Sequence, residues 1–284
     1  MTPSSLIRNT SERFRKAGIP DPETDSSLLL SFLCGRPALR LRLDTETEIS
    51  DALLHEYSLL TERRINREPL QYITCEAPFC GKIFHVNRSV LIPRPETELL
   101  CAWAMELIPF SSACSILDLC CGSGCIGLTL LSERPSLHVT MSDISEAALS
   151  VARKNASRFG LTAEFCCSNL TEMLKNDSFD FVFANPPYIP TEECTSLQPE
   201  VLYEPMIALD GGYDGLCFYR RIVYESVRIL RKNGFLMMEL GYGEAENVSE
   251  LLHDAGYTDI SVRKDLSDID RIILAKAPAW REHV

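Results

Sequence analysis

The sequence lacks the features that mark an exported or membrane-bound protein. No basic segment followed by an apolar stretch stands at its start. The longest apolar run, Leu28-Leu29-Leu30 with Phe32 and Leu33, is far too short to span a bilayer. With 45% hydrophobic and 24% charged residues among 284, the composition is that of an ordinary globular chain with material for one large domain, or a small and a larger one. We therefore expect a cytoplasmic protein without membrane contact.

The sequence also lacks the spacings that mark metal sites and disulfide frameworks, although it holds twelve cysteines. Cys120-Cys121 and Cys166-Cys167 are adjacent pairs, and no Cys-x-x-Cys motif or nearby pair of histidines accompanies them. Zinc sites and disulfide-rich domains have regular spacings. We therefore expect no metal site, and we interpret the cysteines as reduced, mostly buried thiols that pack as small hydrophobic side chains.

Positive charge is scarce in most of the chain. The net charge is −12, and residues 96–284 hold 15 Lys and Arg against 28 Asp and Glu, whereas residues 1–95 hold 13 against 12. A protein that grips a phosphate backbone needs a basic face. The sequence therefore disfavours stable binding of DNA or RNA, while a local basic patch stays open.

Residues 1–73 have a helical pattern. Apolar residues recur at helical spacing, interrupted by two prolines near residue 20, and predict a bundle of four or five short helices. Asp21, Thr24 and Asp25 are candidate caps of the second helix. Three arginines lie together near the end of this stretch: Arg63, Arg64 and Arg67. Because charge runs usually form solvated faces, we interpret these arginines in that way.

Residues 74–98 predict a β-hairpin and a stiff linker. Apolar residues flank Gly81-Lys82, which is a turn signal. Two prolines then hold Arg94 in an extended conformation, and Glu96-Thr-Glu98 opens a helix that we expect to end near residue 108. This segment separates the expected helical domain, residues 1–73, from the expected second domain, residues 99–284.

From residue 113 onward, strand patterns alternate with helix patterns. The alternation predicts an α/β fold with βαβ units and a mostly parallel sheet. The last two strands are expected to form an antiparallel pair around the polar loop 265–270. The expected strands are 115–119, 138–142, 164–167, 179–184, 234–240, 259–264 and 271–276. The expected helices are 126–132, 146–159, 218–230 and 244–255.

The stretch Ile116–Gly127 is typical of a strand that runs into a glycine-rich turn at the start of a helix. Glycine lets the backbone approach a ligand closely. Gly122, Gly124 and Gly127 spell Gly-x-Gly-x-x-Gly, a weak signal for a dinucleotide when taken alone. Asp143, at the end of the following strand, can accept hydrogen bonds from ribose hydroxyls, and it is also a candidate helix N-cap. A dinucleotide and an S-adenosyl cofactor satisfy these features equally.

The stretch Phe181–Tyr188 predicts a buried strand that stops at Asn185. Pro186 and Pro187 forbid both helix and further ladder pairing, so a stiff turn forms where open α/β sheets bind ligands. The side-chain carbonyl of Asn185 and the backbone carbonyl of Pro186 can accept both N–H groups of a conjugated nitrogen and return electron density to it. The ring of Tyr188 can stack on the planar group and favour positive charge near a methyl. Methyl transfer from a sulfonium is an in-line displacement, so positioning would supply most of the catalysis.

The glycine turn, Asp143 and Asn185-Pro-Pro-Tyr188 resemble class I S-adenosylmethionine methyltransferases of the Asn-Pro-Pro-Tyr type, which methylate adenine in nucleic acids or glutamine in proteins. Three neighbouring stretches narrow the resemblance to the release factor glutamine methyltransferase family (PrmC, also called HemK): Arg67–Ile73, Phe79–Val86 and Leu91–Glu98. The resemblance covers residues 63–276, and the helical start fits by architecture.

This resemblance implies a Rossmann-like class I methyltransferase sheet with an antiparallel C-terminal strand, and S-adenosylmethionine as methyl donor. The implied substrate is the glutamine in the Gly-Gly-Gln motif of class 1 peptide-chain release factors, whose methylation belongs to translation termination. The N-terminal helices and the hairpin would help to recognise that folded protein. We expect the enzyme to act as a monomer.

The resemblance also assigns site residues. The implied catalytic residues are Asn185, Pro186, Pro187 and Tyr188. The implied cofactor-binding residues are Cys120, Cys121, Gly122, Ser123, Gly124, Asp143, Asn169, Leu170 and Asn185. Two further segments, Glu204-Pro205 and Ala208–Gly212, are similar to later family segments and are expected to line or support the pocket.

Two positions depart from the family pattern. Cys120 stands where the glycine turn usually begins with Gly, and Asn169 stands where Asp commonly lies near the adenine. Related ribosomal-protein glutamine methyltransferases also carry Cys in such a turn, but Pro93–Glu98 matches the release factor enzymes better. The alternatives are a ribosomal-protein glutamine methyltransferase, a nucleic-acid adenine N6-methyltransferase and, more remotely, a nicotinamide-dependent oxidoreductase.

Overall fold

The computed structural model describes residues 1–111 and 113–278, and these residues form two compact units. The first unit comprises Met1–Glu76 together with Gln198–Tyr203. The second comprises Ala77–Leu197 and the described residues from Glu204 onward. The chain therefore leaves the first unit at residue 76, returns to it for six residues, and leaves it again.

The first unit is a helical bundle. Its helices are α1 (Pro3–Lys16), α2 (Pro22–Cys34), α3 (Ala38–Leu43), α4 (Asp51–Ile65) and α5 (Leu70–Thr74). The core contains Phe14, Leu29, Leu30 and Tyr57, each fully buried. Helix α1 begins with a capping box at Thr2, whose hydroxyl accepts from the Ser5 amide, so two backbone donors that the helix cannot satisfy find partners. The expected caps of α2 fail, because Asp21 precedes the helix without a side-chain cap bond.

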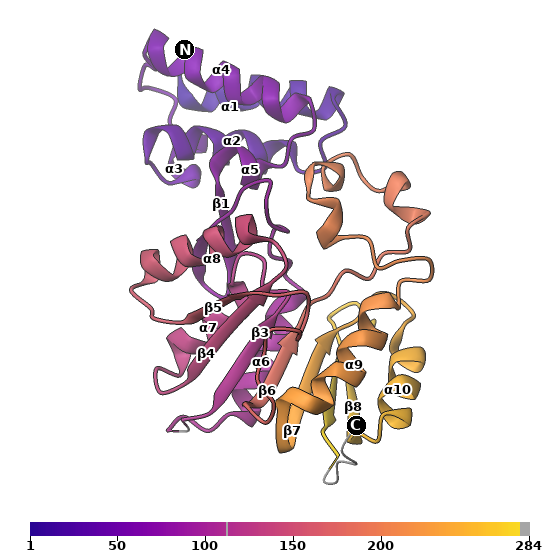
Figure 1. Cartoon of the computed structure of the whole chain (residues 1–284). Coiled ribbons are helices and arrows are strands. Elements are labelled where there is room, and N and C mark those ends of the chain that lie inside the picture. Colours follow the sequence, from indigo (N-terminus) through magenta and orange to yellow (C-terminus); the bar gives the residue numbers. More distant parts are fainter. Residues whose placement is uncertain (112, 279–284) are drawn as a thin grey trace. The chain divides into compact units, whose positions relative to one another are not determined.

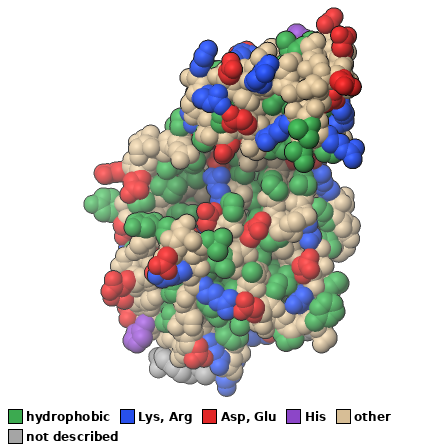
Figure 2. Space-filling model, turned by 180° about the vertical axis from the view of Figure 1, so that it is seen from behind, with side chains coloured by type: hydrophobic (Ala, Val, Ile, Leu, Met, Phe, Trp, Pro, Cys, Tyr) green, Lys and Arg blue, Asp and Glu red, His purple; other side chains and the backbone are tan. Residues whose placement is uncertain are grey.

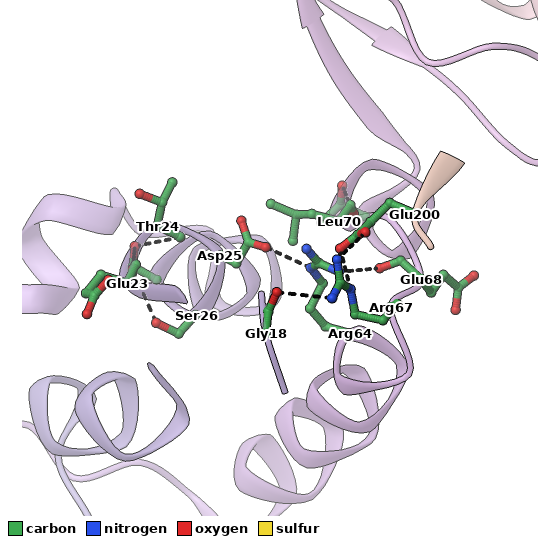
Figure 3. A network of polar contacts seen from close by, with 12 residues as sticks. Gly18, Glu23, Thr24, Asp25, Ser26, Arg64, Arg67, Glu68, Leu70 and Glu200 are labelled. Atoms are coloured by element: carbon green, nitrogen blue, oxygen red, sulfur yellow. Dashed lines mark hydrogen bonds and ion pairs between the residues drawn. The ribbon is translucent and has the colours of Figure 1, made fainter. Parts of the chain in front are cut away.

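The arginines at the end of α4 do not form a solvated face. Arg64 is buried, and its guanidinium lies 2.7 Å from Asp25 and 3.0 Å from Glu200 (Figure 3). Arg67 joins the same glutamate at 2.6 Å, and Arg63 pairs with Glu68. The prediction of a solvated face is therefore wrong, because acidic residues from distant parts of the sequence surround Arg64.

The second unit begins with a two-stranded hairpin around the expected turn, formed by β1 (Glu76–Phe79) and β2 (Lys82–His85). Phe79 and Phe84 are fully buried and meet edge to face, with ring centroids 5.9 Å apart. The linker then leads into α6 (Thr97–Leu107). Phe84 also meets Phe159 edge to face, with ring centroids 4.9 Å apart, and both hairpin phenylalanines belong to the hydrophobic core of the second unit, which holds the hairpin to it.

A seven-stranded sheet forms the centre of the second unit, with strand order β5-β4-β3-β6-β7-β9-β8 (Figure 1). The first five strands along the sheet are parallel, and β9 pairs antiparallel with both β7 and β8. The strands are β3 (Ser115–Leu119), β4 (His138–Asp143), β5 (Glu164–Cys167), β6 (Phe179–Ala184), β7 (Leu230–Glu239), β8 (Thr258–Lys264) and β9 (Asp270–Lys276). The predicted parallel α/β sheet with an antiparallel C-terminal strand is confirmed.

Helices cover both faces of the sheet because successive strand residues point to opposite sides. Phe181 and Phe183 of β6 pack with helices α6, α7 (Cys125–Glu133) and α8 (Glu146–Phe159). Val182 and Ala184 pack on the other face with α9 (Cys217–Ile229) and α10 (Ala245–Asp254). The unit therefore has three layers, and its central strands are apolar on both sides.

One sequence-based expectation, the start of strand β7, needs correction in this unit. Strand β7 starts at Leu230, directly after α9, four residues earlier than the expected strand. Phe179 pairs with Leu230 before an irregularity, after which the regular register with Phe235 begins. The exposed Arg231, Lys232 and Asn233 at this end hide the strand from a pattern of apolar residues.

The cysteines are less buried than expected. All twelve are free, three of them are buried, and six are half-buried. Three are exposed: Cys75, Cys167 and Cys217. The interpretation of the cysteines as mostly buried side chains is therefore wrong for these three.

The surface drawn in Figure 2 carries acidic and basic side chains interspersed with one another. No large field of one sign is visible on that face. Throughout residues 1–111 and 113–278, every helix is too short or too polar to cross a membrane.

Candidate functional site

Four parallel strands end at the same level of the sheet. Leu119 of β3 pairs with Ala184 of β6 and with Ser142 of β4, and Asp143 pairs with Cys167 of β5. The residues after these strand ends therefore lie side by side. Strands β3 and β6 are neighbours although β4 and β5 lie between them in the chain, which makes this edge the topological switch point where open α/β sheets bind ligands.

A cavity of about 250 Å³ opens at this edge. Most of the sequence-predicted site residues line it: Cys120, Cys121, Gly122, Ser123, Asp143, Asn169, Leu170, Asn185 and Pro187. The linker supplies another wall, from Ser89 to Thr97, and Pro205, Ile207 and Ala208 supply a third. Gly124, Pro186 and Tyr188 are not among the residues that line the cavity.

The glycine turn between β3 and α7 has three residues with positive φ. Cys120 has φ 58°, Gly122 has φ 53° and Gly124 has φ 76°. A Cβ on Gly124 would lie 3.1–3.2 Å from Met141, Ala152 and Leu128, so glycine is required there by packing. No atom lies within 4 Å of a Cβ built on Gly122, so the backbone there is bare toward open space. Only Gly122 of the two thus leaves room for a ligand.

Burial holds the nearby thiols neutral. Desolvation, and then the carboxylates Asp143 and Asp118, raise the pKa of the Cys120 thiol far above its ordinary value. The same burial raises the pKa of Cys121 and Cys125. A thiolate is the nucleophilic form of cysteine. The cavity can therefore hold a reactive methyl donor beside Cys120 without offering it a competing thiolate.

Asp118 of β3 supports the glycine turn through the first turn of α7. Its Oδ2 accepts from the backbone amide of Gly127 at 2.8 Å, and a Cβ on Gly127 would lie 3.0 Å from the same oxygen. Burial raises the pKa of Asp118 to about 8. Gly127 therefore completes the Gly-x-Gly-x-x-Gly string for packing between α7 and β3 and has no ligand role.

Asp143 ends β4 with its carboxylate at the cavity wall. Its Oδ2 accepts from the Gly122 amide and its Oδ1 from the Ser145 amide, both at 2.9 Å. Burial raises its pKa, and these two backbone donors oppose the rise. The N-cap of α8 is Ser145, whose hydroxyl accepts from Ala148 at 3.2 Å, so Asp143 is not the cap. The Ile144 amide is a third backbone donor to this carboxylate, and because two oxygens offer about four acceptor sites, the carboxylate can also accept from a ligand.

Asn169 is already engaged on both sides of its amide. Its Nδ2 donates to Glu172 at 2.6 Å, and its Oδ1 accepts from Arg221 at 3.0 Å. Leu170 follows in a left-handed conformation with φ 51° and is buried. The pair therefore offers the cavity an apolar wall and a fixed amide, and Arg221 adds a cation that the sequence patterns did not single out.

The Asn-Pro-Pro-Tyr turn is anchored by a hydroxyl and a carboxylate. Asn185 donates from Nδ2 to Thr97 Oγ1 at 3.2 Å. Tyr188 is oriented by its hydroxyl, which donates to Glu239 Oε1 at 3.4 Å. Burial, and then Glu239, raise the pKa of the Tyr188 phenol, so it stays neutral and cannot serve as a base.

Glycines let a neighbouring loop reach this turn. Ile189 donates to the Leu209 carbonyl at 2.9 Å, and Gly211 donates back to the Ile189 carbonyl at 2.8 Å. A Cβ on Gly211 would lie 2.6 Å from the Tyr188 Cα, and one on Gly215 would lie 2.5 Å from the Tyr188 carbonyl oxygen. The segment Ala208–Gly212, expected to line or support the pocket, lies against the back of the turn.

Glu204 ties the same loop to the linker. Its carboxylate accepts from the Ile92 amide at 2.9 Å and forms an ion pair with Arg94. The Glu204 side chain is 1% exposed, whereas that of Arg94 is 32% exposed. Arg94 therefore keeps part of its guanidinium at the cavity, held by a buried partner.

The sequence patterns missed Glu239 and the role of Thr97. Thr97 stands inside a motif that was singled out, but a threonine next to two glutamates carries no sign of its partners. Glu239 follows the buried run Leu236-Met-Met238, and an acidic residue at the end of a buried strand was the available signal.

Two family models match the chain, one to each part of the described fold. A methyltransferase small domain matches residues 98–208. A PrmC N-terminal domain matches residues 5–74. The first match includes the glycine turn, Asp143 and the Asn-Pro-Pro-Tyr turn.

Two curated relatives that match over more than nine tenths of both chains are named release factor glutamine methyltransferases. The chain is 40% identical over 266 residues to a release factor glutamine methyltransferase of Caulobacter vibrioides, covering 93% of this chain and 92% of that protein. It is 37% identical over 276 residues to one of Clostridium acetobutylicum, covering 95% and 94%. Among solved structures, a methyltransferase from Pyrococcus furiosus shares the fold with a TM-score of 0.54 at 14% identity, covering 79% of this chain and 98% of that one.

Proposed function

Because this chain belongs to the release factor glutamine methyltransferase family, we propose that it transfers a methyl group from S-adenosylmethionine to the glutamine amide in the Gly-Gly-Gln motif of class 1 peptide-chain release factors. The observation that carries this proposal is the orientation of Asn185. Its Nδ2 donates to Thr97, which turns the side-chain carbonyl away from that contact. An amide carbonyl at the cavity wall is an acceptor suited to an N–H group of the substrate amide.

The residues of the cavity fit the cofactor. Gly122 leaves bare backbone, Asp143 keeps acceptor sites for ribose hydroxyls, and Leu170 offers an apolar wall for a base. Bound there, S-adenosylmethionine supplies a methyl group on a sulfonium that is open to in-line displacement. Asn169 would approach the adenosine with its amide already fixed by Glu172 and Arg221.

Positioning carries the chemistry on the substrate side. Asn185 Oδ1 and the backbone carbonyl of Pro186 would accept the two N–H groups of the glutamine amide and return electron density to its nitrogen. Pro187 keeps the turn stiff, and Tyr188 would face the planar amide with a ring held by Glu239. Fixing both partners in line removes most of the entropic cost of the reaction.

A methylation assay tests this proposal. Purified class 1 release factor is incubated with the enzyme and S-adenosylmethionine, and the Gly-Gly-Gln peptide is analysed by mass spectrometry. We expect the mass of one added methylene on the glutamine, and no gain when that glutamine is replaced by alanine. Asn185→Ala should reduce the rate by about 10²-fold or more, because the nitrogen loses an acceptor made for the reacting geometry. No mass gain with the unaltered enzyme would refute the proposal.

The same assay separates the alternatives. Ribosomal proteins and DNA are offered in parallel, and labelled methyl should appear in the release factor alone. We propose in addition that the enzyme is a cytoplasmic monomer without stable nucleic-acid binding, as its acidic composition favours. The nicotinamide-dependent alternative loses its basis, because the family to which the chain belongs is one of methyltransferases.

A further inference from the structure

A buried carboxylate lies behind the Asn-Pro-Pro-Tyr turn. Glu239 ends β7 and is 1% exposed. Its Oε2 accepts from the Thr97 hydroxyl at 2.6 Å, and its Oε1 accepts from the Tyr188 hydroxyl at 3.4 Å. Thr97 is itself 2% exposed and accepts from Asn185 Nδ2. One carboxylate therefore reaches both polar side chains of the turn, one directly and one through a hydroxyl.

The number of available protons fixes the donor and the acceptor of each hydrogen bond in the chain Asn185–Thr97–Glu239, which we call the relay. An ionised carboxylate can only accept hydrogen bonds, and a threonine hydroxyl has a single proton to donate. The Thr97 proton therefore goes to Glu239, and Thr97 Oγ1 is left as an acceptor. The atom of Asn185 that faces Thr97 must then be the donor Nδ2, so Oδ1 has to lie on the opposite side of the amide.

We propose that Glu239 is a positioning residue for methyl transfer. In its ionised form, Glu239 accepts the Thr97 proton, and Thr97 then fixes the Asn185 amide in the orientation that presents Oδ1 to the substrate. The inference rests on the proposed function of the turn. It adds a residue that touches neither the cavity nor the reacting atoms. Protonated Glu239 can donate to Thr97, which frees the threonine proton for Asn185 and favours the inverted amide, with Nδ2 toward the substrate.

The surroundings of Glu239 place its titration in a range where the relay can switch. Its pKa is raised to about 7, chiefly by burial and to a smaller extent by Glu96 of the linker. Thr97, Arg271 of β9 and Tyr188 oppose this rise. The α9 residue Tyr219 donates to the Glu239 backbone carbonyl at 2.9 Å, and on α7 the neutral thiol of Cys125 also feels the carboxylate.

The sign of the pH dependence follows from these groups. Below about pH 7 the carboxyl becomes protonated, the relay reverses and the rate falls. For one proton, the rate at about pH 6 should be about tenfold lower than at about pH 8. The change should appear in kcat for intact release factor more than in KM, because a folded protein docks through many contacts outside the amide.

Three variants test the relay by pH profiles. Glu239→Gln can still accept from Thr97 through its amide oxygen but cannot titrate. The fall in rate below about pH 7, which we call the acid limb, should therefore disappear, while the rate at about pH 8 stays within about threefold of that of the unaltered enzyme. Thr97→Val keeps the shape and removes the hydroxyl, and kcat should fall by about tenfold or more. Thr97→Ser should restore both the rate and the limb.

A matched control uses Glu244, whose carboxyl has a raised pKa similar to that of Glu239. Burial also raises the pKa of Glu244 to about 7, and this residue accepts from the Gly241 amide outside the relay. Glu244→Gln should keep the acid limb. An unchanged limb in Glu239→Gln, or an unchanged kcat in Thr97→Val at about pH 8, would overturn the proposal.

A second measurement needs no substrate. The side-chain amide resonances of Asn185, followed by nuclear magnetic resonance in isotope-labelled protein, should move with an apparent pKa near 7. They should stay constant in Glu239→Gln. Resonances that do not move in the unaltered protein would overturn the relay even if release factor is methylated. Resonances that move as expected would support it even if the methyl acceptor proved to be another protein.

Discussion

At the scale of single residues, Cys120 occupies a backbone conformation that most side chains avoid. Its φ of 58° lies in the left-handed region, where a Cβ crowds the following carbonyl. The resemblance of the motifs implies glycine at this position. The structure gives the physical reason, since the turn needs positive φ at this residue whichever side chain it carries.

Substitutions of Cys120 should separate backbone strain from cavity chemistry. Cys120→Val adds a branched Cβ in the left-handed region and should lower the free energy of unfolding by about 2 kcal/mol. Cys120→Gly should be within about 1 kcal/mol of the unaltered protein, because relief of strain offsets the greater freedom of the unfolded chain. Urea unfolding followed by circular dichroism measures both. Equal losses for glycine and valine would contradict this account.

The residues that line the cavity could be predicted from the sequence more easily than the residues that position them. Asn185, Asp143 and Gly122 belong to short patterns with a chemical meaning, and all three line the cavity. Thr97 lies 88 positions from Asn185 and 142 positions from Glu239 in the chain, and it forms a hydrogen bond with each. Such distant hydrogen bonds leave no local pattern, so the relay became visible only in the structure.

At the scale of elements, the active turn depends on a loop that touches it backbone to backbone. Gly211 and Gly215 lie so close to Tyr188 that neither has room for a Cβ. Since the neighbouring atoms are backbone, they cannot move aside as a flexible side chain could. The position of the Asn-Pro-Pro-Tyr turn therefore depends on glycines that never meet the substrate.

Gly211→Ala should accordingly displace the turn. A Cβ there would lie 2.6 Å from the Tyr188 Cα and 2.7 Å from the Gly215 carbonyl oxygen. Because catalysis relies on placement of the amide, we expect kcat to fall by about 10²-fold. The matched control is Gly160→Ala at the end of α8, where φ is 66° but no atom lies within 4 Å. That variant should lose about 1 kcal/mol of stability and keep its activity.

Measurement of methyl transfer to intact release factor compares the two glycines. A rate for Gly211→Ala equal to that of Gly160→Ala would show that the turn tolerates displacement. Calorimetry of S-adenosylmethionine binding should give similar affinities for both variants, because Gly122, Asp143 and Leu170, which would hold the cofactor, lie outside the displaced turn.

Most elements followed directly from the sequence because their physical causes are local. Alternating apolar residues with helices between them gave the parallel sheet, and Gly81 gave the hairpin turn. Strand β7 was the exception at its start, because Arg231, Lys232 and Asn233 are exposed there and pairing with β6 decides the boundary. The edge β8 has a similarly polar pattern, yet its pairing with β9 was foreseen from the loop between them.

At the scale of the whole molecule, the division into units does not follow the order of the chain. Residues 198–203 belong to the helical unit although more than 120 residues separate them from its last helix. Within that unit, Glu200 joins Arg64 and Arg67, and the Tyr203 hydroxyl donates to the Asn66 carbonyl at 2.7 Å. The interpretation of the arginines as a solvated run could not foresee a partner so far along the chain.

The cluster around Arg64 should be essential to the stability of the helical unit. Arg64→Met leaves Asp25 and part of Glu200 buried without their cation, which should cost about 3–5 kcal/mol. Burial already raises the pKa of Asp25, and Arg64 opposes that rise. The control is Arg13→Met, whose side chain and that of its partner Glu62 are both about half exposed, so this ion pair should contribute less than about 1 kcal/mol.

Chemical unfolding with a probe in the helices measures this difference. The two variants have the same change of side chain, each in the last turn of a helix, so propensity for helix formation is nearly matched. Equal losses would mean that the cluster adds no more to stability than a surface ion pair does.

The return of residues 198–203 to the helical unit also limits how the protein can be shortened. A chain that begins at Ala77 keeps Gln198–Tyr203 but loses the helices among which they fold, and Leu202 and Glu200 would become an unstructured insertion directly before Glu204. Glu204 holds Arg94 and the Ile92 amide, so slack in that insertion would reach the cavity wall. Separation of a working methyltransferase fragment therefore requires two cuts and a new short connection in place of these six residues.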